Sequence, residues 1–327
     1  MRPLMLAPLR GFTDVVFRNA FQRHFQGIDE AVAPFVTTTK GRRVNRSHLR
    51  DLEPADNRAM PVVPQILGND PGEFIRLSQA MFDLGYPEIN WNLGCPYPMV
   101  AKKLRGSGLL PHPDRIDRML GAIVGAFPGR LSVKTRLGRF SAEEMAPLIP
   151  IFNRYPLARV IIHPRTGMQM YEGAVDLQAF ETCLNLIVHP VVYNGDISDP
   201  DRFHSLEAKF PTVSAWMLGR GLIVNPFLPE MIQRQDPAVR KRNLRFAQFH
   251  DDLLHGYGER FCGPGHVLDR MKGFWGYFGK GMSDGRRIVR QIRKTTSLGE
   301  YRDVVASALA GRRIWADPSA AGSSSGR

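Results

Sequence analysis

The sequence predicts an α/β fold, a TIM (β/α)8 barrel followed by a C-terminal all-α helical bundle. Up to residue 236, short apolar runs alternate with segments of helical periodicity, the pattern of parallel strands joined by crossover helices. After residue 237 the strand-like runs stop. The 327 residues, 43% of them hydrophobic, exceed one average domain and suit a barrel with an appendage. We therefore predict a barrel domain over 1–236, a helical domain over 237–315 and a disordered Ser/Gly/Ala-rich tail over 316–327.

The barrel elements can be placed in order along the chain. The apolar runs that predict strands cover residues 4–7, 28–36, 60–66, 88–92, 131–134, 160–162, 191–193 and 213–218. Helices are expected between them at 13–25, 71–84, 113–126, 141–153, 177–184 and 200–210. Thr13 is placed as the N-cap of the first helix. Glu143 and Glu144 lie in the first turn of another, where the helix dipole favours acidic side chains.

The predicted helical domain carries most of the positive charge. Four helical segments near 239–255, 265–278, 284–294 and 298–311 are separated by glycines. The net charge of the chain is +13, and residues 237–313 hold 16 Lys and Arg against 7 Asp and Glu, a net of +9. Such a concentration of basic residues indicates a polyphosphate partner such as a nucleic acid, and the alternative is a basic helical domain that is merely soluble.

Cysteine usage and hydropathy exclude several classes of protein. Cys95, Cys183 and Cys262 form neither a CxxC pair nor an even framework, which indicates a reducing cytoplasm. No apolar run is long enough to span a bilayer, and the apolar stretch at the N-terminus is too short for a signal peptide. Walker A and GxGxxG loops are absent from the sequence. We therefore expect a cytoplasmic protein that makes no membrane contact, and we infer no obligate protein partner.

A lone cysteine follows a buried strand in the stretch 89–96, Ile-Asn-Trp-Asn-Leu-Gly-Cys-Pro. Gly94 and Pro96 end the strand, and the carboxyl end of a barrel strand is where chemistry is placed. A buried core cysteine is the commoner interpretation of any single Cys. Asn90 and Asn92 favour a site instead, because a core position has no use for two amides and a kinked loop. Cys95 is therefore the candidate catalytic residue.

Polar or glycine residues end each of the predicted barrel strands. Taken singly, most would be surface residues, but a succession at one end of a barrel favours a site. They include Arg10, Gln65, Asn90, Asn92, Lys134, Arg136, His163, Arg165, the stretch 194–196 (Asn-Gly-Asp) and the stretch 219–221 (Gly-Arg-Gly).

These residue types fit a flavin. Loops after the last two strands of a barrel commonly hold a phosphate on backbone amides, and Gly195 and Gly219 allow close approach. Lys134 would stabilise negative charge near N1 of a reduced flavin, and Gln65 could bind the amide edge of the ring. A Cys95 thiol of ordinary pKa, about 8.5, is protonated at neutral pH and can act as a general acid. A covalent nucleophile would need a neighbouring base; none stands in the local sequence, although His163 could approach in space.

At this point several motifs resemble those of the tRNA-dihydrouridine synthase family. The stretch 6–14 (Leu-Ala-Pro-Leu-Arg-Gly-Phe-Thr-Asp) with Phe17 and Arg18 is similar to the opening motif of that family, and 90–96 to its active-site motif, followed by Gly-Ser-Gly at 106–108. His163 to Thr166 resembles its HxRT segment, and 194–196 and 219–221 its phosphate loops. The resemblance covers residues 4 to about 225 densely and the helical part more weakly.

The resemblance implies an FMN-dependent barrel with a helical tRNA-binding domain, in which NADPH reduces FMN and FMN reduces a D-loop uridine to 5,6-dihydrouridine. Hydride would pass from FMN N5 to C6, and Cys95 would protonate C5. The implied FMN-binding residues are Pro8, Leu9, Arg10, Gln65, Lys134, His163, Asn194, Gly195, Asp196, Gly219 and Arg220. The residues implied to hold the uracil and its neighbours are Asn92, Arg165 and Tyr171. Four further candidates for binding the tRNA are Arg270, Lys272, Tyr277 and Arg293, for which the alternative is solvated helix charge and a core tyrosine.

Two departures from the family pattern and two rival functions complete the sequence-based picture. Leu9 stands where methionine is common and Leu177 where tryptophan is frequent. An Arg-x-Lys pattern at Arg270 and Lys272 leans toward the subgroup that modifies uridine 16. The rivals are an FMN barrel oxidoreductase acting on a small molecule and a non-catalytic tRNA-binding protein. The small-molecule enzyme would not need the basic C-terminal region.

Overall fold

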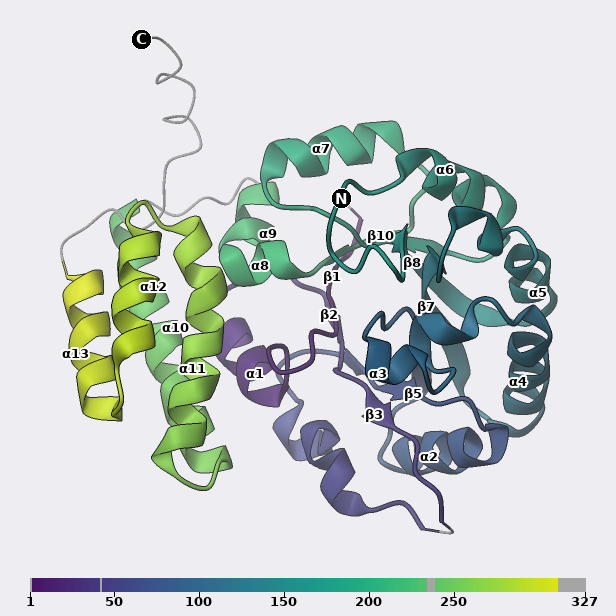
Figure 1. The fold of residues 1–327 in the computed structure, drawn as a ribbon, viewed down its shortest axis with the longest axis horizontal. Helices are drawn as coiled ribbons and strands as arrows, with labels where there is room; N and C mark the ends of the chain where they lie inside the picture. Colours follow the sequence, from purple (N-terminus) through teal and green to yellow (C-terminus); the bar gives the residue numbers. More distant parts are fainter. Residues whose placement is uncertain (1, 42, 234–238, 311–327) are drawn as a thin grey trace. The chain divides into compact units, whose positions relative to one another are not determined.

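The computed structural model describes residues 2–41, 43–233 and 239–310 (Figure 1). The tail predicted over 316–327 lies outside the described residues. The described chain divides into two compact units. The first consists of residues 1–15, 28–197 and 201–219, and the second of residues 16–27, 198–200 and the region from 220 onward.

The first unit is a barrel of parallel strands. Its strands are β1 (Leu4–Leu6), β2 (Glu30–Val32), β3 (Val36–Thr37), β4 (Val62–Val63), β5 (Gln65–Leu67), β6 (Glu88–Leu93), β7 (Arg130–Gly138), β8 (Leu157–Thr166), β9 (Val191–Tyr193) and β10 (Ala215–Leu218). All pairs are parallel and follow the order β3-β5-β6-β7-β8-β9-β10-β1-β2-β4. Because β2 pairs with β4 and β3 with β5, the ends of this order meet and the sheet closes. The predicted barrel is confirmed.

The barrel has eight strand positions but ten strands, because two prolines each divide one strand in two. The runs predicted at 28–36 and 60–66 are each divided, by Pro34 between β2 and β3 and by Pro64 between β4 and β5. Proline has no N–H to donate, so it interrupts the hydrogen-bonded ladder. The carbonyl of Pro64 still accepts a hydrogen bond from Asn90 N at 2.8 Å, so β4 and β5 remain aligned beside β6.

Helices cover the outside of the barrel. They are α2 (Pro71–Asp83), α4 (Pro113–Ala126), α5 (Leu148–Arg154), α6 (Leu177–Leu186) and α7 (Pro200–Lys209) (Figure 1). The single helix predicted over 141–153 is wrong: a short 3-10 helix, η4 (Ala142–Met145), is followed by Pro147 and then α5. Pro147 cannot sit inside a continuous helix because it lacks the N–H that would bond to the preceding turn. Ser141 and Glu144 form the capping box of η4.

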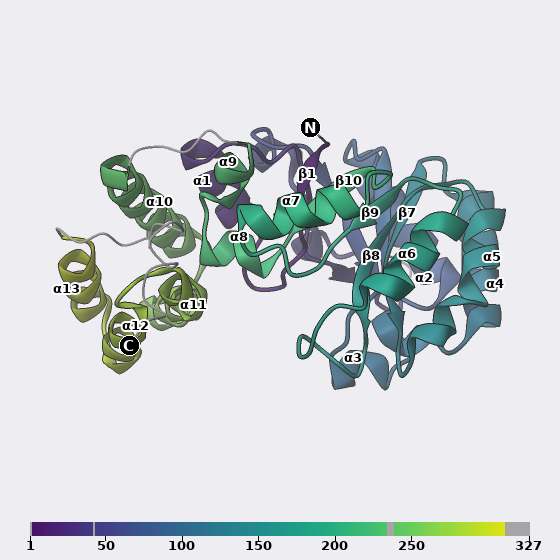
Figure 2. The same ribbon diagram turned by 90° about the horizontal axis from the view of Figure 1, so that it is seen from above.

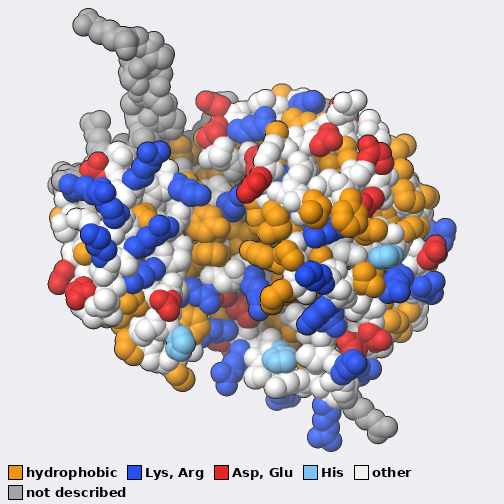
Figure 3. All heavy atoms as spheres, in the orientation of Figure 1, with side chains coloured by type: hydrophobic (Ala, Val, Ile, Leu, Met, Phe, Trp, Pro, Cys, Tyr) orange, Lys and Arg blue, Asp and Glu red, His pale blue; other side chains and the backbone are white. Residues whose placement is uncertain are grey.

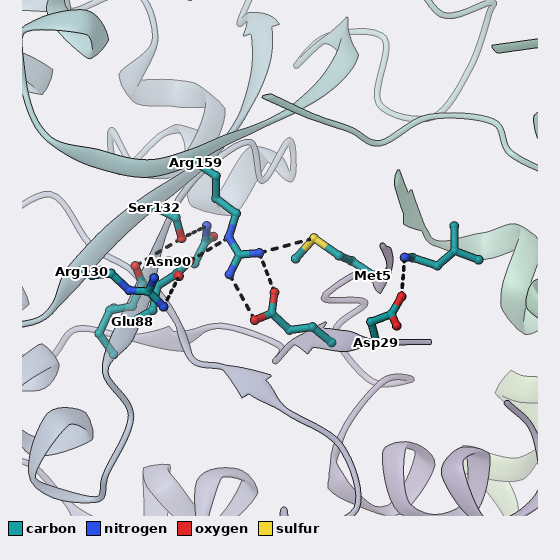
Figure 4. A network of polar contacts seen from close by, with 10 residues as sticks. Met5, Asp29, Glu88, Asn90, Arg130, Ser132 and Arg159 are labelled. Atoms are coloured by element: carbon teal, nitrogen blue, oxygen red, sulfur yellow. Dashed lines mark hydrogen bonds and ion pairs between the residues drawn. The ribbon is translucent and has the colours of Figure 1, made fainter. Parts of the chain in front are cut away.

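The barrel interior has an apolar side and a polar side. The apolar cluster comes from β1, β2, β4, β8, β9 and β10, and consists of Met5, Ala7, Val32, Val63, Ile161, Val192, Ala215 and Met217. The polar side comes from β5, β6 and β7, where Gln65, Asn90 and Ser132 are fully buried. At the amino end of the strands Arg159 contacts Glu88, as Figure 4 shows. Arg159 also forms an ion pair with Glu30.

The second unit is helical. Its elements are α1 (Val15–His24), α8 (Arg220–Val224), α9 (Leu228–Ile232), α10 (Val239–Arg260), α11 (Pro264–Phe278), η5 (Gly279–Gly281), α12 (Gly285–Lys294) and α13 (Leu298–Leu309). The four helices predicted after residue 237 are present. Their core is aromatic, with Phe17 of α1 lying 5.7 Å from Phe249 and 5.8 Å from Phe274 between ring centroids. Because α1, α8 and α9 belong to this unit, the change of pattern at residue 237 lies within it rather than at its edge.

Candidate active site at the carboxyl end of the strands

The loop that carries Cys95 is shaped by an asparagine and a glycine. Oδ1 of Asn92 accepts hydrogen bonds from the backbone N–H of Gly94 at 3.1 Å and of Cys95 at 2.8 Å, which turns the chain at the end of β6. The carbonyl of Cys95 accepts from Ser107 N at 3.0 Å. Gly106 has φ +56°, and a Cβ there would lie 2.7 Å from the Cys95 carbonyl oxygen. Only glycine fits this position, so the 106–108 segment can close onto Cys95.

Two arginines hold this loop: Arg136, which the sequence placed at a strand end without a role, and Arg139, which sequence reasoning did not select. Nε of Arg136 donates to the Gly94 carbonyl at 2.9 Å, and its Nη1 donates to the Thr166 carbonyl at 2.8 Å. Nη1 of Arg139 donates to the Pro96 carbonyl at 3.0 Å. Arg136 stands two residues after Lys134 on the same strand, and this spacing places both side chains on one face of the strand. That alternation was the available signal for Arg136.

Burial keeps the Cys95 thiol protonated. The residue is 7% exposed, and desolvation raises the pKa of its thiol above the ordinary value. The backbone N–H of Tyr97 and the positive charges of Arg136 and Arg10 act in the opposite direction, but burial outweighs them. A protonated thiol suits a general acid. His163 does not serve as a base through Nε2, because that atom lies 3.0 Å from the guanidinium Nη1 of Arg165, which can only donate.

Side-chain amides form a chain beneath the loop. Nδ2 of Asn92 donates to Oε1 of Gln65 at 2.8 Å, and Nε2 of Gln65 donates to Oδ1 of Asn90 at 2.7 Å. Nδ2 of Asn90 then donates to Oγ of Ser132 at 3.0 Å. The four residues are buried on three neighbouring strands, which fixes the orientation of every amide. The predicted residues Gln65 and Asn92 are therefore brought together.

Lys134 is held by an amide rather than by a carboxylate. Its Nζ donates to Oδ1 of Asn194 at 2.7 Å, and Nδ2 of Asn194 donates to the Met217 carbonyl at 2.9 Å. Within the described part of the chain Lys134 forms no ion pair. Desolvation and the positive charge of Arg136 lower the pKa of Lys134 to about 7. An anion placed beside this ammonium would relieve both effects.

The two predicted phosphate loops follow neighbouring strands. Asn194, Gly195 and Asp196 follow β9, Gly219 follows β10, and these strands pair at Tyr193 and Trp216. A Cβ on Gly219 would make ordinary van der Waals contacts with the Cβ of Ala7 at 3.6 Å and Nδ2 of Asn194 at 4.0 Å. Arg220 comes next in the chain and is the first residue of α8. Asp196 has φ +42°.

Arg165 is buried, and its guanidinium is bound by groups of the barrel unit itself. It is 3% exposed, and its guanidinium forms a two-pronged ion pair with Asp196. Its Nη2 also donates to the Gly173 carbonyl at 2.6 Å. Arg165 thereby fixes the loop that carries Tyr171, whose ring lies 5.2 Å from the guanidinium carbon of Arg136 and 6.3 Å from the His163 ring.

The residues predicted after the first strand have different environments. Leu9 packs against the apolar cluster of the barrel. Pro8 is partly exposed beside it, and Arg10 is exposed with its guanidinium carbon 5.5 Å from the centre of the Phe35 ring. Oγ1 of Thr13, which we predicted as a helix cap, accepts from Leu9 N at 2.8 Å and donates to the Ala7 carbonyl at 2.9 Å. The helix itself begins at Val15, so Thr13 shapes the strand-end loop.

In the helical unit, the four predicted tRNA-binding residues differ in what they contact. The guanidinium carbon of Arg270 lies 5.2 Å from the ring centres of Tyr257 and Phe261. Nζ of Lys272 donates to the carbonyls of Thr295 and Arg293 at the end of α12. Tyr277 is partly exposed with Lys280 over its ring at 5.6 Å, and Arg293 is exposed.

Helix α12 holds the exposed cations that sequence reasoning mostly missed. Ile288 and Ile292 are its buried face. Its exposed basic side chains are Arg286, Arg287, Arg290, Arg293 and Lys294. The signal was present in the sequence, since two isoleucines four residues apart among five cations mark one buried and one charged face. Figure 3 shows Lys and Arg side chains gathered over this part of the helical unit.

The described residues hold neither a metal cluster nor a membrane span. No group of three His, Cys, Asp or Glu side chains is arranged to hold a metal ion among the residues that the structure describes. No helix in the same part of the chain is long and apolar enough to cross a membrane.

Comparisons with solved structures show the fold. A variant of NCR from Zymomonas mobilis aligns with a TM-score of 0.51 at 13% identity, over 72% of this chain and 87% of that one. The old yellow enzyme homologue from the same organism gives a TM-score of 0.52 at 12% identity, over 72% and 89%. At this identity the likeness concerns the barrel architecture alone.

Comparisons of sequence show the family. A "Probable tRNA-dihydrouridine synthase" of Staphylococcus aureus (strain COL) is 30% identical over 312 residues, covering 91% of this chain and 90% of that protein. A protein of the same name from Staphylococcus epidermidis (strain ATCC 35984) is 29% identical over 92% of both chains. The family model described as dihydrouridine synthase (Dus) matches residues 5–278. The chain therefore belongs to the dihydrouridine synthase family of flavin-dependent oxidoreductases and forms dihydrouridine in tRNA.

Proposed function

We propose that the flavin is FMN, that NADPH reduces it, and that Cys95 donates the proton that completes reduction of a tRNA uridine. The observation that carries this proposal is a buried thiol held on a clamped loop at the same end of the barrel as the buried side chain of Lys134. When bound, FMN supplies the hydride that N5 transfers to C6 of the uracil ring. The thiol supplies the proton to C5, so that the C5–C6 double bond becomes a single bond and Cys95 is left as a thiolate.

The residues present fit FMN. Lys134 would offer a positive charge to a reduced flavin, and an anion beside it would counter the burial and the Arg136 charge that lower its pKa to about 7. Gln65 keeps one N–H and one lone pair beyond its two amide contacts. Leu9 supplies an apolar surface. The backbone at Gly219 and at the 194–196 loop offers N–H groups for the phosphate. We assign Pro8, Arg10, His163 and Arg220 to the same binding set.

The resemblance assigned Asn92, Arg165 and Tyr171 to the substrate. Oδ1 of Asn92 is occupied by two backbone N–H groups, and the Arg165 guanidinium by Asp196 and Gly173. We propose that Asn92 positions Cys95 and that Arg165 positions the loop of Tyr171. Tyr171, which is partly exposed, would then contact the uracil or its neighbour. Modification of position 16 stays a prediction that mapping of dihydrouridine in tRNA would decide.

Replacement of Cys95 tests the proposal. The Cys95→Ala protein is expected to stay yellow and to bind tRNA as wild type does, while turnover falls by about 100-fold or more because the proton donor is absent. Dihydrouridine formed in tRNA from a strain lacking the enzyme is measured with NADPH as reductant, together with the flavin absorbance. Cys95→Ser, which keeps a weaker acid, should retain more activity than the alanine variant.

A purified protein that takes up no FMN would overturn the cofactor assignment. Turnover of Cys95→Ala at the wild-type rate would overturn the assignment of the acid while leaving the cofactor in place. Comparing turnover with NADH and with NADPH tests the choice of reductant independently of the cofactor and acid assignments.

We also propose that α12 supplies the main phosphate contacts of the helical unit. Substitution of Arg287, Arg290 and Arg293 by alanine is expected to weaken tRNA binding and to lower the salt dependence, by about 0.7 to 0.9 in the logarithmic slope for each phosphate that is no longer neutralised. Arg154→Ala is the control, since Arg154 is an exposed arginine of the barrel unit that pairs with Asp117. The affinity for tRNA is measured at several salt concentrations. An unchanged slope in the triple variant would remove α12 from the interface.

A further inference from the structure

Large hydrophobic side chains stand exposed around the mouth of the barrel. Among the described residues the exposed ones are Tyr97, Met99, Phe140, Met168, Leu186, Val188 and Leu244. Four of these seven follow β6, β7 and β8 at their carboxyl ends: Tyr97 is 52% exposed, Met99 81%, Phe140 67% and Met168 58%. We call these four the apolar rim. Figure 3 shows hydrophobic side chains gathered on the face of the barrel unit that carries these loops.

Hydrogen bonds between the loops hold the apolar rim together. Met168 N donates to the Arg139 carbonyl at 2.9 Å, which places Met168 beside the residue before Phe140. Nη1 of Arg139 donates to the carbonyl of Pro96 at 3.0 Å, directly before Tyr97. The three loops therefore form one surface. In Figure 2, α3 (Pro98–Ala101) and the loop after β8 extend from the same end of the barrel.

The exposed ring of Phe140 sits on a rigid loop. The carboxylate of Glu144 accepts from the backbone N–H groups of Arg139 at 2.8 Å and of Phe140 at 2.9 Å. Tyr97 is held as well, since its carbonyl accepts from Val100 N and Ala101 N, both at 2.9 Å. Exposed aromatic side chains on fixed backbone lose little conformational freedom on binding, which is the property of a recognition surface.

The apolar rim adjoins the thiol and is interleaved with cations. The backbone N–H of Tyr97 faces the sulfur of Cys95, two residues earlier. The guanidinium carbon of Arg139 lies 5.9 Å from the centre of the Phe140 ring, and Lys102 and Lys103 are exposed just after Met99. Residues 94–113 contain no Asp or Glu. Aromatic and thioether side chains with interspersed cations suit bases and phosphates of a single nucleic-acid strand.

We propose that the apolar rim is a stacking surface for the unpaired nucleobases that flank the uridine in tRNA. This inference rests on the proposed function and adds to it. Uridine leaves the base stack to reach a thiol that is 7% exposed, so its neighbours lose a stacking partner. Tyr97 and Phe140 replace that partner with a ring, and Met99 and Met168 with a polarisable thioether. The surface can stack on any of the four bases, because every base has an aromatic face.

Matched variants test the apolar rim. Tyr97→Ala and Phe140→Ala are compared with Leu186→Ala and Val188→Ala. Leu186, 54% exposed, is the last residue of α6, and Val188, 73% exposed, precedes β9 at the amino end of the barrel. The rim variants are expected to bind tRNA about tenfold less tightly and to fall about tenfold in kcat/KM. Their salt slope, flavin content and Tm should equal those of the controls, since no phosphate-binding or core group is removed. Rim variants that bind tRNA as tightly as Val188→Ala would overturn the proposal.

A modified substrate identifies the contact as stacking. A tRNA with an abasic nucleotide next to the modified uridine should bind wild type about tenfold less tightly, yet bind Tyr97→Ala or Phe140→Ala with little further loss. Equal losses in wild type and in both variants would show that the rim does not touch those bases. Phe140→Trp should keep the wild-type affinity and Phe140→Ser should not. If wild type with FMN and NADPH forms no dihydrouridine, the proposed function fails; if it does and the rim variants match the controls, only this inference fails.

Discussion

Buried cations at the two ends of the barrel differ in their ion-pair partners and in the direction of their pKa shifts. At the amino end, Arg159 contacts Glu88 at 2.9 Å and forms a second ion pair with Glu30, and these partners raise the pKa of Arg159 against the opposing effect of its burial (Figure 4). Toward the carboxyl end, desolvation lowers the pKa of Lys134 to about 7 and of Arg136 to about 10. Neither forms an ion pair with any residue the structure describes. Among the described residues, Arg159 has carboxylate partners, whereas Lys134 and Arg136 are held by amide and carbonyl oxygens.

The difference has a physical consequence for stability. A buried charge without a partner costs free energy, and a protein keeps it only where binding or catalysis uses it. At the amino end Arg159 of β8 is paired with Glu30 of β2 and Glu88 of β6, so these ion pairs link the three strands. Toward the carboxyl end, the proposed flavin would offset the cost of burying Lys134. We therefore expect the amino-end charges to stabilise the barrel and Lys134 to contribute to binding of the flavin.

The largest expected effect on stability follows from breaking the ion pairs at the amino end. Arg159→Ala leaves Glu88, which is 4% exposed, with only the exposed Arg130 at 3.4 Å among the ion-pair partners that the structure describes. Removing one partner of a buried ion pair costs about 3 kcal/mol or more, and we expect that loss in the free energy of unfolding by urea. Arg154→Ala is the control, because Arg154 pairs with Asp117 at the surface and should cost less than about 1 kcal/mol. Equal losses in the two variants would contradict a structural role for the amino-end cluster.

The sequence could predict the barrel and the position of its candidate site because both depend on local patterns. Apolar runs placed the strands, and Asn92, Gly94 and Cys95 marked the site by their position after one of them. The clamps by Arg136 and Arg139 depend on carbonyls of β8 and of the Cys95 loop, which no local pattern reveals. The same holds for α1, whose Phe17 joins the aromatic core of the helical unit although the chain places it after the first barrel strand.

A smaller effect is expected when the carboxyl end is changed. Lys134→Met keeps the length and the apolar stem of the side chain while removing the charge. The variant should bind oxidised FMN with a modest loss and should stabilise reduced flavin less, which lowers the flavin reduction potential. A loss of about 1 to 2 kcal/mol in binding the reduced form is expected for one charge-assisted hydrogen bond. Lys209→Met, a basic residue at the end of α7, is the control. A reduction potential identical to that of wild type would show that Lys134 does not face the flavin.

The smallest effect concerns the dependence of stability on pH in protein freed of flavin. The pKa of Lys134 is about 7 in the folded state and near 10.5 when unfolded, so the unfolded chain binds more protons between these values. Folding stability from this group therefore rises with pH through that window. Below pH 7 the folded protein carries the full cost of the charge.

The measurement compares wild type with Lys134→Met by urea unfolding at about pH 6, 7, 8 and 9, a series that spans the folded pKa. Lys134→Met should be the more stable protein at the acid end, and the difference should narrow toward the alkaline end because wild-type Lys134 loses its proton. The raised pKa values of Cys95 and Cys183 affect both proteins alike and cancel in the difference. A gap that stays constant across the series would mean that Lys134 keeps its charge in the folded barrel, and the contrast between the two ends would then rest on geometry alone.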